Sequence, residues 1–239
     1  MRTGWFRAVH VKSTRSHELK MLLTSRKPLV NKLLDVENQI RGSLKVFGLK
    51  VGKISRRQFE ARVLALLEQR PDLLAIARLL LRVRSVILEE YGNLDRLVLQ
   101  AARRDTTCQR LMSVPNVGAV VALTFRAGVD VPARFTRSKA VGAHFGLVPC
   151  KHQSGEVDRT GRISKVGDAM VRTALYEAAS VMLSRVVRFS AFKAWALHVA
   201  HRRGMNKAKV ALARKLAVIL RRIWVDGTTF RWGSEPQAT

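Results

Sequence analysis

Acidic residues are scarce in this chain of 239 residues, in which 17 Asp and Glu stand against 44 Lys and Arg, giving a formal net charge of +27. That excess is far larger than solubility requires. Lys and Arg side chains that neutralise phosphates release counterions, so a polyanionic partner is the physical interpretation of this charge. The alternative is a basic protein held at an anionic membrane surface, but no amphipathic anchor of the lipid-binding type stands out.

Cysteines and long apolar runs are equally scarce. Cys108 and Cys150 lie far apart without metal-ligand spacing, which predicts unpaired thiols in a reducing cytosol. Arginines interrupt every long apolar pattern, and the first residues lack the apolar centre of a signal peptide, so the sequence predicts a cytoplasmic protein with no membrane partner. The hydrophobic content of 47% is nevertheless enough for a folded core.

Familiar catalytic and metal-binding patterns are also missing. The chain has no Walker motif, no dinucleotide fingerprint and no Ser-His-Asp signature. His198 and His201 could share a helix face, but no Cys or carboxylate stands near them to complete a metal site. Glu156 and Asp158 are flanked by arginines and are interpreted as salt-bridge partners rather than Mg²⁺ ligands. The sequence therefore predicts no metal site and no cofactor within this chain.

Helical spacing of apolar residues dominates what is present, which predicts a mainly α fold. The first half should form a long antiparallel helical arm or coiled coil, interpreted as a scaffold or dimerisation arm. A helix from Ser13 should be kinked or interrupted at Pro28, and a third helix should begin at Pro71. Arginines that interleave with its apolar stripe are expected to be solvated. These are Arg78, Arg82 and Arg84, and the other predicted segments are a linker over Gly48–Ile54 and a helix over Ser55–Gln69.

The second half predicts a compact helical domain. The predicted organisation is a remnant of a preceding domain over residues 1–12, with one strand near Gly4–Val11, then the arm over 13–106, the helical domain over 107–230 and a flexible tail over 231–239. Within the helical domain, Asp168–Arg185 and Ser190–Gly204 should be helices, and a last helix should run from about Asn206 to Trp224. Its apolar face and purely basic opposite face would suit DNA phosphates. The cations proposed to contact DNA there are Lys207, Lys209, Arg214 and Lys215.

The turn Val114-Pro115-Asn116-Val117-Gly118 lies between a short helix and an apolar helix, a pattern similar to a helix-hairpin-helix. In such a unit, backbone N–H groups at the glycine turn and the following helix N-terminus can hold a DNA phosphate. Pro115 and Gly118 are therefore candidate DNA-binding residues. The alternative interpretation is a plain helix connector.

The stretch Gly146–Leu175 is predicted to be a polar, glycine-punctuated loop that runs into a helix. It carries Ser154 directly before Gly155, and a flexible glycine lets backbone approach a bulky ligand. The surrounding candidates for phosphate contact are Lys151, His152, Arg159, Arg162 and Lys165. A hydroxyl in such a loop serves either phosphoryl transfer or simple phosphate contact, and His152 serves either as its base or as a phosphate hydrogen-bond donor. The residues alone leave both alternatives open.

Taken together, these motifs resemble the C-terminal domain of the one-ten (one-ten, one-sixteen, nine-oh-two) family of insertion-sequence transposases. The matching features cover roughly a quarter of the chain, and the helical region before them is similar to the family's coiled-coil segment. In order, they are the Pro-x-x-Gly hairpin, the Gly-Leu-Val-Pro turn, Gln153-Ser154-Gly155, Gly161-Arg162-Ile163-Ser164-Lys165 and the helix start at Gly167-Asp168.

The resemblance implies a DNA recombinase guided by a structured RNA, in which a serine attacks a DNA phosphodiester and forms a phosphoserine intermediate. Ser154 is the position that matches this serine. The resemblance also implies an N-terminal RuvC-like domain with an acidic tetrad that binds Mg²⁺, and none of these acids has a counterpart here. We therefore expect a fragment that is inactive alone and acts as a homo-oligomer or with full-length transposase. The alternatives are a non-catalytic nucleic-acid-binding remnant that regulates intact copies and a helical scaffold.

Overall fold

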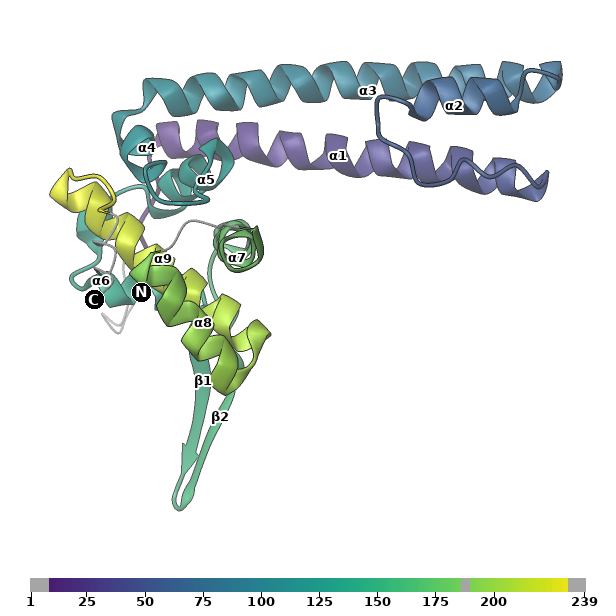
Figure 1. The fold of residues 1–239 in the computed structure, drawn as a ribbon. Helices are drawn as coiled ribbons and strands as arrows, with labels where there is room; N and C mark the ends of the chain where they lie inside the picture. The colour runs from purple at the N-terminus through teal and green to yellow at the C-terminus, as the bar shows by residue number, and fades with distance from the viewer. Residues whose placement is uncertain (1–8, 186–189, 232–239) are drawn as a thin grey trace, which may run out of the picture. The chain divides into compact units, whose positions relative to one another are not determined.

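The computed structural model describes residues 9–185 and 190–231, and over these ranges the fold is mainly α, as predicted (Figure 1). None of the helices in these ranges is long and apolar enough to cross a membrane. In chain order, the elements are α1 (Thr14–Val46), α2 (Phe59–Leu66), α3 (Pro71–Arg104), α4 (Thr106–Leu111), α5 (Ala119–Val129), the 3₁₀ helix η1 (Pro132–Arg134), α6 (Ser138–His144), β1 (Pro149–Ser154), β2 (Val157–Ile163), α7 (Ala169–Arg185), α8 (Ala191–Arg203) and α9 (Met205–Asp226).

The chain divides into two compact units, one comprising residues 21–97 and the other residues 1–20 and 98–239. The predicted strand near Gly4–Val11 and the predicted tail lie almost wholly outside the described residues, and residues 9–13 have no regular structure.

In the unit over residues 21–97, α1 and α3 run antiparallel. Arg26 on α1 pairs with Asp95 near the end of α3 (Nε–Oδ1 2.8 Å), whereas Glu37 meets Arg84 and Leu44 packs in the same apolar cluster as Ala77. Residues further along α1 therefore meet residues earlier in α3. The short helix α2 completes this cluster with Phe59, Val63 and Leu67.

Two features of this unit differ from the sequence analysis: the predicted solvation of Arg84 is wrong, and of the two alternatives given for Pro28, a kink or an interruption, the interruption is wrong. Arg84 is not solvated: it is 3% exposed, its guanidinium donates to Glu37 (2.9 Å) and to the carbonyl of Arg56 (2.8 Å), and it lies over the Phe59 ring. Pro28 does not interrupt α1, which continues through it to Val46. Pro28 is itself exposed, so packing of neighbouring helical residues outweighs the local cost of a proline inside the helix.

The other unit is built around α9, which packs against α4, α6, α7 and α8. Its buried residues recur at helical spacing and are mostly alanine and leucine, so neighbouring helices can approach closely. They are Ala208, Leu212, Ala213, Leu216, Ala217, Leu220 and Ile223. The buried face of α7 likewise consists of apolar residues, whereas Val181 is 38% exposed. The buried residues are Val171, Ala174, Leu175, Ala178, Ala179, Met182 and Leu183.

A buried carboxylate ties the start of α1 to the end of α5 within this unit. Asp130 accepts hydrogen bonds from the Ser13 hydroxyl (2.5 Å), the Ser13 backbone N–H (3.0 Å) and the Ser16 hydroxyl (2.6 Å), and it pairs with His10 (2.8 Å). Burial alone would raise the pKa of Asp130, but the hydrogen bonds from Ser13, Ser16 and His10 outweigh it and hold the pKa well below its usual range.

Candidate nucleic-acid interface

The segment around Ser154 is a β-hairpin, so the prediction of an irregular loop is wrong. β1 and β2 pair antiparallel, with Ser154 opposite Val157 and His152 opposite Arg159. Pro149 pairs with Ile163 and Lys151 with Thr160, which leaves Cys150 opposite two residues and makes a β-bulge near the base. Figure 1 shows the hairpin projecting away from the helices of its own unit.

Two glycines close the base of the hairpin. Gly146 (φ +65°) and Gly167 (φ +77°) both adopt the left-handed conformation that favours glycine. A Cβ at Gly146 would lie 2.4 Å from the backbone nitrogen of Val166, and one at Gly167 would lie 2.0 Å from the carbonyl oxygen of His144. The Gly-Leu-Val-Pro and Gly-Asp motifs thus bring the two backbone segments into direct contact.

Backbone and side-chain hydrogen bonds reinforce this base. The Ser164 N–H donates to the Val148 carbonyl (2.9 Å), which extends the ladder beyond the strands. Arg172 on α7 donates to the carbonyls of Phe145 (3.1 Å) and Val166 (3.0 Å) and so joins both segments. The sequence prediction missed Arg172, because no local motif marks a residue that acts through such distant carbonyls.

Asp168 links the hairpin base to two other elements. Its carboxylate accepts from the Met170 N–H (2.9 Å) at the start of α7 and pairs with Lys20 (3.0 Å) and Lys12 (3.9 Å). Burial opposes ionisation, but the hydrogen bond and charge of Lys20 outweigh it and lower the pKa of Asp168. Asp168 therefore connects the base of the hairpin to α7, Lys20 and Lys12.

The far end of the hairpin is fully solvent-facing, with every residue from Lys151 to Arg162 exposed. Ser154 ends β1, and Gly155 follows in the turn with φ +55° and open space around it. The hairpin carries the candidate cations Lys151, Arg159 and Arg162 together with Glu156 and Asp158, and Lys165 lies just beyond β2. The hairpin is thus only weakly cationic, and most of the positive charge of the chain lies elsewhere.

Strand alternation sorts the hairpin residues by face. Ser154 and His152 lie two apart on β1, so they share a face with their cross-strand partners Val157 and Arg159. The His152 ring lies close to Gly161, where a Cβ would be 3.6 Å from the imidazole Nε2. Asp158 pairs with Gln153 on the opposite face and is therefore directed away from Ser154.

The helix-hairpin-helix-like turn joins α4 to α5. Asn116 occupies the left-handed region (φ +62°), and Gly118 precedes α5 with an exposed backbone and nothing within 4 Å of its Cβ position. A phosphate could approach the first N–H groups of α5 here. The binding roles of Pro115 and Gly118 remain predictions.

The candidate cations of α9 do not form one solvated basic face. Lys207 and Arg214 are exposed, and Lys209 is half-buried. Lys215 lies over the Trp195 ring (4.0 Å), and burial lowers its pKa. Arg221 donates to the Ser138 hydroxyl (2.8 Å) and the Phe135 carbonyl (2.5 Å), so it serves the fold. The hairpin candidates are therefore more uniformly exposed to solvent than the candidates on α9.

A sequence model described as "Transposase IS116/IS110/IS902 family" matches residues 108–196, which include the hairpin and α7. The chain is 33% identical over 233 residues to the "Transposase for insertion sequence element IS1111A" of Coxiella burnetii, covering 95% of this chain and 64% of that protein. It is 31% identical over 237 residues to a "Probable family 20 transposase" of Pseudomonas aeruginosa, covering 95% of this chain and 69% of that protein.

A third relative is the "Transposase for insertion sequence element IS1328" of Yersinia enterocolitica, with 27% identity over 213 residues, 86% of this chain and 62% of that protein. The chain thus spans about two thirds of the length of these relatives.

Proposed function

This chain belongs to the IS116/IS110/IS902 family of transposases, and we propose that it binds DNA and presents Ser154 as the nucleophile of strand cleavage and exchange. The observation that carries this proposal is the exposed hairpin, which places one hydroxyl beside a two-residue turn at the end of a braced strand pair. A narrow projection of this kind can reach a phosphodiester without a clash between the helices and the duplex.

The proposed chemical step is an in-line displacement at phosphorus. The Ser154 Oγ forms a bond to the DNA phosphorus, one P–O bond to a deoxyribose breaks, and the released sugar oxygen takes up a proton. The hydroxyl proton of Ser154 passes to a general base, for which His152 on the same strand face is the candidate. Reversal by another sugar hydroxyl would release the serine and exchange strands.

The hairpin does not fit a divalent metal ion. Mg²⁺ requires a near-octahedral set of oxygen ligands. Asp158 is directed away from Ser154, and the described residues contain no group of three or more His, Cys, Asp or Glu that could hold a metal. We therefore derive no metal-assisted step from this chain, and any Mg²⁺ that the reaction needs would bind outside the described residues.

The proposed partners are DNA, a structured guide RNA and further transposase subunits. Support for a subunit contact comes from an apolar stripe on α3, where Ile76, Leu79, Val83 and Val86 are each at least 50% exposed. Their spacing of three and four residues matches the seam of a coiled coil. A second copy or a full-length transposase would cover this stripe.

A trans-complementation assay tests the proposed function. The chain is mixed with a longer family member whose own matching serine is replaced by alanine, together with labelled element DNA and Mg²⁺. We expect a covalent protein–DNA adduct of this chain's mass on a denaturing gel, and its loss in Ser154→Ala. Thr160→Ala is the matched control, because Thr160 is equally exposed on the same hairpin but pairs with Lys151 on the opposite face.

The second candidate function is a non-catalytic DNA-binding module that competes with intact transposase, which the lack of a metal-ligand group in the described residues favours. It predicts DNA affinity without any adduct, whether or not a longer relative is present. A Ser154→Ala variant then behaves as wild type in every assay. Adduct formation that depends on Ser154 excludes this alternative.

A further inference from the structure

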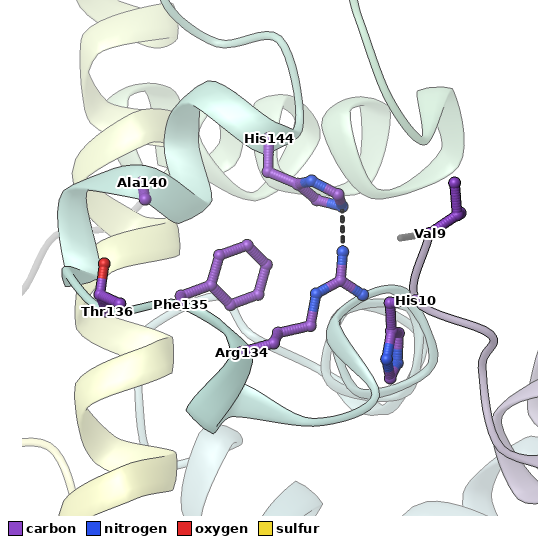
Figure 2. Close-up of a pocket in the computed structure, with 7 residues that line it drawn as sticks. All are labelled: Val9, His10, Arg134, Phe135, Thr136, Ala140 and His144. Carbon is purple, nitrogen blue, oxygen red and sulfur yellow. Dashed lines mark hydrogen bonds between the residues drawn. The ribbon is translucent and has the colours of Figure 1, made fainter. Parts of the chain in front are cut away.

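A pocket with a volume of about 760 Å³ opens on another part of the same unit, between η1, α6 and the residues that precede α1 (Figure 2). Arg134, His144, His10 and Thr136 supply its polar wall, and Phe135 and Ala140 lie beside them. The volume lies within the range of small-molecule sites and far exceeds what one ion needs. The pocket therefore suits a ligand of nucleotide size.

Two contacts position the Arg134 guanidinium at this pocket. Its guanidinium lies over the Phe135 ring (4.9 Å to the centroid) and donates from Nη2 to the His144 Nε2 (3.2 Å). Figure 2 shows the guanidinium extending toward the His144 ring with His10 beside it. A guanidinium has five N–H donors, and within the described ranges that of Arg134 makes one hydrogen bond, which leaves donors for a ligand.

The charge around Arg134 is not balanced by a carboxylate. Asp168 is engaged by Lys20 and Lys12, and Asp130 by His10, Ser13 and Ser16, whereas Arg134 forms no ion pair within residues 9–185 and 190–231. Burial, followed by the charges of Arg134 and Lys12, lowers the pKa of His144, consistent with a neutral imidazole that accepts from Arg134. None of the described residues that line the pocket is acidic.

We propose that this pocket binds the phosphate group of a nucleotide, with the Arg134 guanidinium as the bidentate donor and His10 and Thr136 at the wall. Arginine matches phosphate geometry with two parallel N–H···O bonds. The site is separate from the Ser154 hairpin. The proposal rests on the proposed function in one respect, because a nucleic acid would supply the phosphate that the pocket binds. A free nucleotide and a strand end carry the same chemistry.

The test is a titration of the full chain with thymidine 5′-monophosphate, followed through the imidazole NMR signals. We expect shifts at His10 and His144 but not at His198 or His201, and no response to thymidine, which lacks the phosphate. Arg134→Gln should weaken binding about tenfold or more, as expected for a charge-assisted hydrogen bond. Arg137→Gln is the matched control: it removes the same charge three residues away, outside the pocket lining, and should change affinity less than about twofold.

Equal losses in the two arginine variants, or shifts spread over all histidines, would overturn the proposal because general charge attraction explains both. Should Arg134→Gln fail to fold, Ala140→Trp decides the question, since Ala140 is exposed and a large side chain there fills the pocket. A 5′-phosphorylated oligothymidylate that competes with the mononucleotide, where its unphosphorylated counterpart does not, identifies a strand end as the source. If the chain binds the mononucleotide but forms no Ser154 adduct, the proposed function is contradicted and the proposal for this pocket is not.

Discussion

Asp130 is the residue on which the start of α1 depends most directly. It accepts from two hydroxyls and one backbone N–H and pairs with His10, while only 5% of its surface is exposed. Removing the charge would leave these donors, of which Ser16 is buried, with a weaker acceptor. We expect Asp130→Asn to lower the free energy of unfolding by about 2–3 kcal/mol, measured by urea denaturation. The exposed Asp158→Asn is the control and should change it by less than about 0.5 kcal/mol.

The same carboxylate makes stability depend on pH in a defined direction. Because the pKa of Asp130 is depressed in the folded state, its contribution to stability is fully present above the ordinary Asp pKa of about 3.9 and is lost as pH falls through the folded pKa. The difference in unfolding free energy between wild type and Asp130→Asn should therefore stay constant above about pH 5 and shrink below about pH 4. A difference that grows on acidification would contradict this assignment.

The hairpin depends on glycine at its base more than at its tip. Gly167 combines a positive φ with a Cβ position 2.0 Å from the His144 carbonyl oxygen, whereas Gly155 has a positive φ in open space. Gly167→Ala should cost more than about 3 kcal/mol of stability and expose Lys151 and Arg159 to trypsin at rates close to those of unfolded chain. Gly155→Ala, the matched control, should cost only about 1–2 kcal/mol. Equal effects would argue against a base-anchored hairpin.

Pro28 lies inside α1, exposed to solvent, where it cannot donate a backbone hydrogen bond. Because a proline in a helix interior costs roughly 3 kcal/mol relative to alanine, Pro28→Ala should raise the unfolding free energy by more than about 1 kcal/mol. Lys27→Ala, at the neighbouring exposed position, should change it by less than about 0.5 kcal/mol. A decrease on removing Pro28 would show that α1 requires the bend a proline imposes.

Local sequence signals predicted the helices better than the hairpin. Leucines at helical spacing, Pro71 at a helix start and the Ser190 and Gly204 boundaries of α8 all act within a turn or two of the chain. The hairpin strands are exposed almost throughout, so they lack the alternation of buried and exposed residues that predicts a strand. The one available signal was the Gly155-Glu156 pair between Ser154 and Val157, which suits a two-residue hairpin turn.

Contacts between distant residues account for the remaining differences. Ser13 and Asp130 meet across 117 positions, and Arg84 reaches Glu37 across 47. Neither pair has a local motif, and each depends on how whole helices pack. The Arg134 pocket could not be predicted from the sequence either, because His10 and His144 come together only in the fold.

At the scale of the whole molecule, the formal charge of +27 predicts DNA binding that weakens steeply with salt. If Arg159 contacts a phosphate, Arg159→Gln should reduce the slope of log affinity against log salt by about 0.9. Arg62→Gln removes the same charge from an exposed site on α2 and should leave the slope for the same DNA unchanged. Fluorescence anisotropy between about 50 and 200 mM salt, a range over which affinity falls strongly, measures the slopes of both variants. Equal reductions would mean that the hairpin has no special place in DNA binding.

Peptide mapping of the adduct tests most directly whether Ser154 becomes covalently joined to DNA. The adduct from the trans-complementation mixture is digested with nuclease and protease, and the modified peptide is sequenced by mass spectrometry. We predict a nucleotide phosphate on the Ser154 Oγ, within the peptide that joins β1 to β2, and none on Thr160 or Ser164. A phosphate on another residue, or no modified peptide from this chain while the DNA is cleaved, would contradict the assignment of Ser154 as the nucleophile.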